Sequence, residues 1–274
     1  QKTFNKSYWK GITFHESDNP SEIDFLSLSN AVTGLDIRSR FRGRGLLLDD
    51  CGSVGINVES TSTDSIDLKN IEIANSGGPG LFIEKGNVFI DWAHIHRCQS
   101  TGIVNDKLGV VDLRNTKVLK NKDNGISNYG TMTAYNLLVK ENRHGIMISS
   151  GIAVVTKGSI LNNRVDGLLI GGSSNVNIES STMKNNLGYG LEVTDWAQED
   201  YFSFWEKGDS PSVKIQQSNF VDNHKTVVLD EYRYDNIWKD WVGIEYTGDG
   251  WVENWQEYKF SEIPFGRIGW IGFQ

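Results

Sequence analysis

The segment His94-Ile-His96-Arg-Cys98 carries residue types that bind transition metals. Imidazole nitrogens and thiolates are ligands that zinc prefers, and alternate residues of a β-strand point to the same face. Zinc needs four close ligands, or three and a water, and the sequence supplies at most three near this point. We therefore expect an outward histidine pair beside a carboxylate, with no metal and no cofactor.

A second group of candidates is aromatic. Residues 194–212 combine aromatic and acidic side chains in one stretch. Aromatic rings of this kind form platforms for sugar rings or anchors for a partner protein. The predicted binding residues of this stretch are Trp196, Tyr201, Phe202 and Trp205.

Composition limits the partners of the chain. Its 274 residues include 27 Lys and Arg against 35 Asp and Glu, which gives a net charge of −8. A nucleic-acid partner is disfavoured because phosphate binding needs a basic stripe. No apolar run reaches the roughly 18 residues that span a bilayer. The chain begins with Gln1 and has no apolar signal segment, so we expect a fragment of a larger protein.

A repeat of about 22 residues positions these candidates. Glycine followed by Ile or Leu recurs at intervals of 20 to 25 residues, at Gly11, Gly34, Gly55, Gly80, Gly102, Gly125, Gly145, Gly167 and Gly190. Three or four residues before most of these glycines stands a small polar residue, at Asn30, Cys51, Ser76, Cys98, Asn121, Asn142, Asn163 and Asn186. Alternating apolar residues after each glycine, and in two further segments per repeat, predict three short strands. Units of this size must stack on their neighbours to bury a core.

The repeat resembles the parallel β-helix repeats of the pectin-lyase-like superfamily over roughly residues 9–229. The resemblance implies an all-β, right-handed parallel β-helix of about nine coils. A leucine-rich repeat has a similar period but needs a Leu-rich consensus with a fixed Asn. We expect the solenoid to fill residues 1–229, with residues 194–212 as an inserted loop. Residues 230–274, where the repeat ends among many aromatic residues, are expected to cap its open end.

The recurring residues have structural explanations. Glycine suits a turn that needs a positive φ or a close backbone approach. Asparagine tolerates left-handed conformations and stacks its amide on the asparagine of the next coil. The small polar residues before the repeat glycines form a column along the coils, which we call the ladder. Cys51 and Cys98 belong to this ladder and lie two coils apart. Their separation of about 9 to 10 Å is too long for a disulfide. We expect two separate thiols, partly buried.

The superfamily resemblance implies two kinds of active site, and neither is complete in the sequence. Its lyases hold calcium with carboxylates from neighbouring coils, whereas the outward residues Asp36 and Glu192 lie seven coils apart, about 34 Å. Its polygalacturonases carry Asn-Thr-Asp, paired aspartates, Gly-His-Gly and Arg-Ile-Lys. Only Asp49-Asp50 and Arg143-His144-Gly145 approach that set. We therefore predict no catalytic residue.

Apolar residues recur two positions after several of the repeat glycines. We expect them to form an outward stripe, which marks an interface or lies under a loop. The stripe contains Phe82, Val104, Met147 and Leu169, of which Phe82, Met147 and Leu169 are predicted binding residues.

The opening Tyr8-Trp9-Lys10-Gly11-Ile12 resembles the coil openings of β-helix ectodomains in large animal surface proteins, the bark beetle or Anakonda type of insect tricellular junctions. That resemblance implies an extracellular, non-catalytic adhesion module with a protein partner or self-association at the cell surface. A carbohydrate-binding or polysaccharide-degrading protein stays open as the alternative. Asn5 begins a glycosylation sequon, which fits a secretory route.

Overall fold

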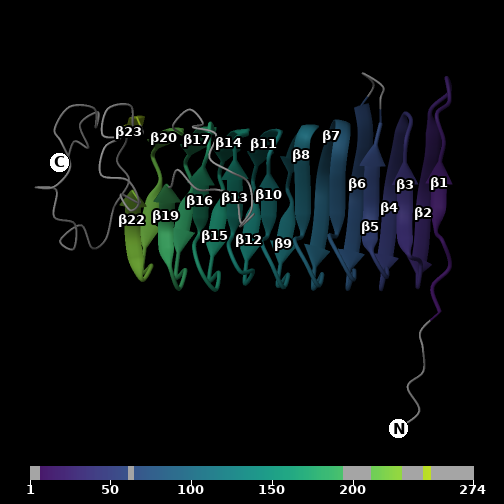
Figure 1. Ribbon diagram of the computed structural model, residues 1–274, viewed down its shortest axis with the longest axis horizontal. Coiled ribbons are helices and arrows are strands. Elements are labelled where there is room, and N and C mark those ends of the chain that lie inside the picture. The colour runs from purple at the N-terminus through teal and green to yellow at the C-terminus, as the bar shows by residue number, and fades with distance from the viewer. Residues whose placement is uncertain (1–6, 61–64, 194–210, 230–242, 248–274) are drawn as a thin grey trace, which may run out of the picture.

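The structure is a computed structural model that describes residues 7–60, 65–193, 211–229 and 243–247. Its elements in these residues are β-strands, which stack in parallel along one axis from β1 at one end to β22 and β23 at the other (Figure 1). Each coil of the chain contributes one strand to each of three parallel sheets. The predicted all-β parallel solenoid is confirmed.

Sheet 1 follows the repeat glycines. Its strands, in spatial order, are β1 (Ile12–Phe14), β3 (Thr33–Ile37), β5 (Val54–Glu59), the first part of β7 (Leu81–His96), the first part of β8 (Ile103–Arg114), β10 (Ile126–Asn128), β13 (Ile146–Ser149), β16 (Leu168–Gly171), β19 (Tyr189–Val193) and β22 (Lys225–Leu229).

Sheets 2 and 3 come next along each coil, and several long strands bend from one into the other. Sheet 2 contains the first parts of β2 (Ser21–Ser29), β4 (Phe41–Asp49) and β6 (Ser65–Ala74), later parts of β7 and β8, then β11 (Thr131–Tyr135), β14 (Ile152–Thr156), β17 (Asn175–Glu179), β20 (Ser212–Gln216) and β23 (Gly243–Thr247). Sheet 3 contains the ends of β2, β4, β6 and β7, then β9 (Lys117–Leu119), β12 (Leu138–Lys140), β15 (Ser159–Leu161), β18 (Thr182–Lys184) and β21 (Asn219–Val221).

Two corners of each coil require a left-handed residue. The corner between sheets 2 and 3 has positive φ at Phe25, Gly45, Asn70, Trp92, Asn115, Asn136, Lys157, Ser180 and Gln217. The corner between sheets 3 and 1 has positive φ at Asn30, Asp50, Asn75, Arg97, Lys120, Glu141, Asn162, Asn185 and Asp222. Asn and Asp are common at both corners because their short polar side chains tolerate this conformation.

In each coil, the residue of the buried polar ladder comes one position after the left-handed residue of the corner between sheets 3 and 1. The ladder asparagines lie inside the coil, and each accepts the backbone N–H of the preceding one: the Oδ1 atom of Asn163 is 3.0 Å from the amide nitrogen of Asn142. The same arrangement joins Asn163 to Asn186 at 3.0 Å. The predicted amide stacking is therefore present, and it satisfies backbone groups that would otherwise be buried without partners.

Two details of the ladder prediction were wrong. Asn30 is a left-handed corner residue, and Ala31 occupies the buried ladder position of that coil, fully enclosed. The left-handed conformation falls on the residue before each ladder asparagine, because the chain has to turn there before its next side chain can point inward. Of the two explanations predicted for the repeat glycines, close backbone approach is confirmed. Apart from Gly11 these glycines do not have positive φ, and a Cβ on Gly145 would lie 2.4 Å from the carbonyl oxygen of Gly167.

Cys51 and Cys98 are free and buried, as predicted. They occupy the ladder position on either side of Ser76, which lies in the intervening coil. Burial raises the pKa of the Cys51 thiol to about 11. The pKa of Cys98 is also raised, again chiefly by burial. Both thiols therefore stay protonated at neutral pH and behave as small side chains of the core.

Candidate functional site

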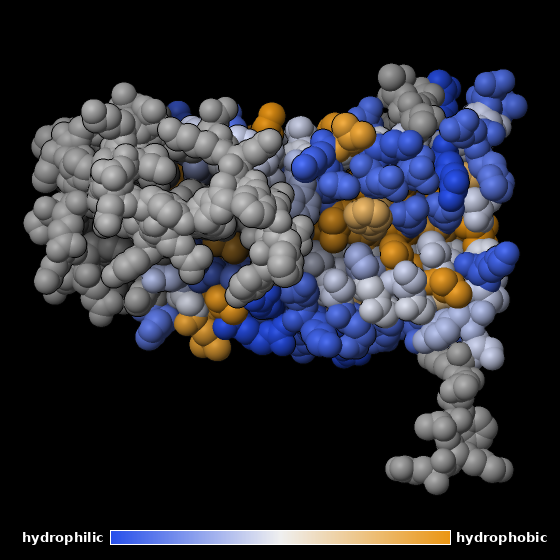
Figure 2. Space-filling model, viewed as in Figure 1, coloured by the Kyte–Doolittle hydropathy of each residue, from blue (hydrophilic) through white to orange (hydrophobic). Residues whose placement is uncertain are grey.

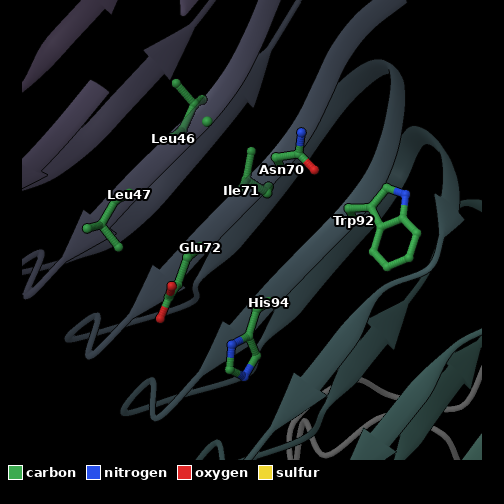
Figure 3. Close-up of a pocket in the computed structure, with 8 residues that line it drawn as sticks. Leu46, Leu47, Asn70, Ile71, Glu72, Trp92 and His94 are labelled. Atoms are coloured by element: carbon green, nitrogen blue, oxygen red, sulfur yellow. The ribbon is translucent and has the colours of Figure 1, made fainter. Parts of the chain in front are cut away.

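An open pocket of about 370 Å³ lies on the outer surface where sheet 2 turns into sheet 3. It crosses three neighbouring strands, β4, β6 and β7. Figure 3 shows Leu47, Glu72 and His94 in a row across these strands, with Trp92 standing at one side. The pocket is lined by Gly45, Leu46, Leu47, Asn70, Ile71, Glu72, Trp92 and His94.

The wall of the pocket is formed by residues of the left-handed corner. Gly45 packs against Phe25 there, since a Cβ at this position would lie 2.9 Å from the Phe25 ring. Trp92, two coils later, has φ 59° and is 61% exposed. A bulky residue in this conformation is strained, whereas the flanking coils place Asn70 and Asn115 at the same corner. Positive φ recurs at this corner in every coil, so the exposed indole at the pocket, and not the conformation, marks Trp92 as a candidate binding residue.

Polar groups lie beside the indole. Glu72 is directly opposite His94 across the β6–β7 pair, and His94 is opposite Lys117 of β9, so the histidine pair lies beside a carboxylate as predicted. Glu72 Oε1 is 3.0 Å from His96 Nε2. The rings of His94 and His96 stack with their centroids 4.2 Å apart. Carboxylate, amide and imidazole groups thus line the same pocket as an exposed indole, an arrangement that suits a ring-shaped ligand carrying hydroxyl groups.

Cys98 takes no part in this cluster. Its side chain is 1% exposed and belongs to the interior ladder, while its sulfur lies 3.7 Å from the carbonyl oxygen of His96. The histidines point outward because they alternate with the fully buried Ile95. The two histidines of residues 94–98 therefore lie on the outer surface of the coil, whereas Cys98 lies in its interior.

The predicted apolar stripe follows one row of sheet 1. In this row Phe82 pairs with Val104, and Met147 pairs with Leu169. Phe82, Val104 and Leu169 are half-buried. Met147 is only 5% exposed, so the expectation of an exposed stripe is wrong at this residue. Among the described residues, the Asn124 amide lies against its sulfur at 3.7 Å.

A buried His144–Asp166 pair beside this row was not predicted. The Nδ1 atom of His144 is 2.9 Å from Asp166 Oδ2, and the two side chains are 8% and 2% exposed. The backbone N–H of Tyr189 donates to the other carboxylate oxygen at 2.7 Å. Asn124, His144 and Asp166 stand just before the repeat glycines of three successive coils. This recurrence of polar residues is the sequence feature from which the pair could have been predicted.

The acidic residues of sheet 1 do not form a shared site. Asp36 and Glu192 stand in the same outward row, separated by seven strand pairings, as expected. Asp36 instead accepts hydrogen bonds from Arg38 at 2.8 Å and from Asn57 at 2.9 Å. These contacts make Asp36 part of a surface network within its own end of the solenoid.

Several predicted residues lie outside the described part of the chain. They are Asn5 and the aromatic residues Trp196, Tyr201, Phe202 and Trp205. Most of the predicted cap, residues 230–274, is also outside it. Within that stretch, β23 pairs in parallel with β20 as a further strand of sheet 2.

Comparison with known families agrees with this architecture. The family model for the right handed beta helix region matches residues 2–143 and, in an overlapping match, residues 35–203. The chain belongs to the right-handed β-helix family. No curated protein matches this β-helix chain. The described residues include no helix that is long and apolar enough to cross a membrane.

Solved structures share the fold of this β-helix protein at low sequence identity. The pectate lyase Pel9A is 12% identical, with a TM-score of 0.58 over 86% of this chain and 68% of the lyase. A mutant of the periplasmic alginate epimerase AlgG is 16% identical, with a TM-score of 0.59 over 85% of this chain and 50% of the epimerase. The fold is therefore the pectin-lyase-like right-handed β-helix, and the chain spans half the length of the epimerase.

Proposed function

We propose that this chain is a non-catalytic recognition module of the extracellular space or cell surface that binds a sugar residue of a polysaccharide. The sugar ring stacks on the indole of Trp92, and its hydroxyl groups meet Asn70, Glu72 and His94. The rigid coil wall holds these groups in place before the ligand arrives, which lowers the entropy cost of binding. The observation that carries the proposal is the exposed indole of Trp92 at the wall of a pocket that polar side chains also line.

Two findings support a polysaccharide ligand. The pocket is open and shallow and crosses three strands, so it accepts one residue of a long chain that continues beyond it. Two solved structures with the same fold are named as a pectate lyase and an alginate epimerase, and these names support the choice of a polysaccharide ligand. The same names support a secreted or periplasmic-type location.

Replacing Trp92 with asparagine should separate binding from stability. Asparagine occupies this corner in the flanking coils, so Trp92→Asn should raise the free energy of unfolding by about 1 kcal/mol through relief of strain. The same change removes the stacking surface and should weaken polysaccharide binding at least about tenfold, or 1.4 kcal/mol. Urea denaturation and a glycan array that includes pectate and alginate measure the two effects.

Tyr135→Asn is the matched control, because Tyr135 is an exposed aromatic residue on sheet 2 away from the pocket. It should leave binding within about twofold of the wild type. Unchanged binding in Trp92→Asn, or failure of the wild-type chain to bind any polysaccharide on the array, would contradict sugar recognition at this pocket.

A second candidate function is adhesion through protein contacts, including self-association at cell junctions. It is favoured by the half-buried row of Phe82, Val104 and Leu169 on sheet 1 and by exposed apolar residues that interrupt the polar surface in Figure 2. Interfaces are enriched in such residues.

If this row mediates self-association, sedimentation should show assembly that increases with protein concentration. A double variant, Phe82→Ser with Leu169→Ser, should shift the midpoint of assembly to at least about tenfold higher concentration, because two apolar contacts are lost. Leu108→Ser, at an exposed residue between sheets 1 and 2, serves as the control. A wild-type chain that stays monomeric at the highest concentration would rule out homophilic adhesion by this module.

A further inference from the structure

We propose that Glu72, His94 and His96 form a binding site for one divalent transition-metal ion of the Zn²⁺ class. The three residues project from the outer surface of sheet 3, on the ends of β6 and β7. A ligand nitrogen or oxygen of each lies within 4.8 Å of those of the other two. The site adjoins the pocket of Trp92, and it stands whether or not that pocket binds sugar.

The strand geometry brings the two imidazoles together. His94 and His96 are alternate residues of β7, and Ile95 between them points into the core with no exposed surface. Their rings stack with a centroid distance of 4.2 Å and an interplanar angle of 24°. Two histidines on one face of a strand therefore present their nitrogens to the same volume of solvent.

The third ligand comes from the neighbouring coil. Glu72 is in register with His94, yet its carboxylate reaches diagonally to His96, where Oε1 is 3.0 Å from Nε2. Ligand atoms around a tetrahedral zinc ion lie roughly 3.3 Å apart. All ligand atoms of the cluster lie within 4.8 Å of one another, so binding requires the side chains to close by about 1.5 Å at most and the stacked rings to splay.

The donor set selects the class of metal. Two neutral imidazole nitrogens and one carboxylate oxygen suit Zn²⁺, Co²⁺, Ni²⁺ and Cu²⁺. Calcium and magnesium prefer sets composed entirely of oxygen ligands. A site with three protein ligands leaves at least one coordination position for water or for a group of another molecule. Because Glu72 and His94 also line the pocket, that open position can meet whatever the pocket holds.

The charged residues around the cluster have opposing effects on the binding of a cation. Glu72 supplies the negative charge that offsets a bound cation, while Lys117 on β9 and Arg97 at the following corner are positive. A neutral imidazole keeps a nitrogen lone pair available for a metal.

The test is a titration of the full chain, purified without a histidine tag and stripped with a chelator, against ZnCl₂ by calorimetry and CoCl₂ by visible absorption. We expect one equivalent of each metal to bind, with d–d bands in the cobalt spectrum. His94→Ala, His96→Ala and Glu72→Gln should each weaken binding at least about tenfold. Binding should also weaken as the pH falls below about 6.5, because protonated histidine cannot act as a ligand.

Two further variants distinguish metal binding at this cluster from binding at another histidine and from an effect of misfolding. His15→Ala removes an exposed histidine in the loop after β1 and should leave the affinity unchanged. Lys117→Met removes the cation opposite His94 and should tighten metal binding several-fold, a gain that misfolding cannot produce. The proposal is overturned if the wild type binds no stoichiometric Zn²⁺ or Co²⁺, or if His94→Ala and His15→Ala bind equally well.

Discussion

Replacing Asn163 with alanine should lower the free energy of unfolding by about 3 kcal/mol. The Asn163 side chain is fully buried, and its Oδ1 accepts the backbone N–H of Asn142 at 3.0 Å. Its Nδ2 donates to Oδ1 of Asn186 at 2.9 Å. Alanine leaves the Asn142 N–H buried without an acceptor and interrupts a chain of amides that polarise one another. Urea denaturation followed by circular dichroism measures the change.

Asn175→Ala is the matched control for this change. Asn175 is an exposed residue of β17, so losing its side chain should alter the free energy of unfolding by no more than about 0.5 kcal/mol. Equal stability of the two variants would mean that the interior ladder contributes little, and that the stacked sheets alone hold the coils in register.

Gly145→Ala should destabilise the fold by about 3 kcal/mol or more. An added Cβ would lie 2.4 Å from the carbonyl oxygen of Gly167 and 2.5 Å from a methyl group of Ile160. The carbonyl belongs to the backbone of the next coil, whose strand spacing is fixed by the hydrogen bonds of three sheets. The overlap therefore cannot be relieved by rotating one side chain. We expect a lower urea midpoint and a reduced yield of folded protein.

Gly52→Ala provides the comparison, because its nearest neighbours would be ring atoms of Tyr8 at 3.2 Å and Gly52 itself is exposed. A partly exposed ring can move by a few tenths of an ångström, so this substitution should cost less than about 1 kcal/mol. If Gly145→Ala were as stable as Gly52→Ala, glycine would be present at the repeat position for a reason other than close backbone approach.

The repeat made the solenoid predictable from residues alone. Glycines such as Gly145 and Gly167 recur once per coil because every coil has the same contact with the next one. A side chain that alternates in a strand must face either the core or solvent, so the outward direction of Phe82 and His94 also followed from the sequence. The pairing of His94 with Glu72 on one side and Lys117 on the other required only a constant number of residues per coil.

The candidate site was less accessible to such reasoning. Trp92 was missed because its exposure depends on a corner between two sheets, and one sequence does not reveal which residue of a strand adopts positive φ. The left-handed corner between sheets 3 and 1 likewise explains the displacement of Asn30 from the ladder. Met147 was expected to be exposed, yet an outward direction does not establish exposure once neighbouring side chains such as Asn124 pack against it.

The sequence by itself determined the coil period, the three strands of each coil and the buried columns, because these depend on local alternation and on identical contacts between successive coils. Only the tertiary structure decided which polar groups meet. His144 reaches Asp166, and Glu72 reaches His96, through side-chain directions and small offsets between adjacent strands that no residue spacing encodes. Distances of about 3 Å between side chains depend on rotamers and local twist, and these are set by packing in the assembled solenoid.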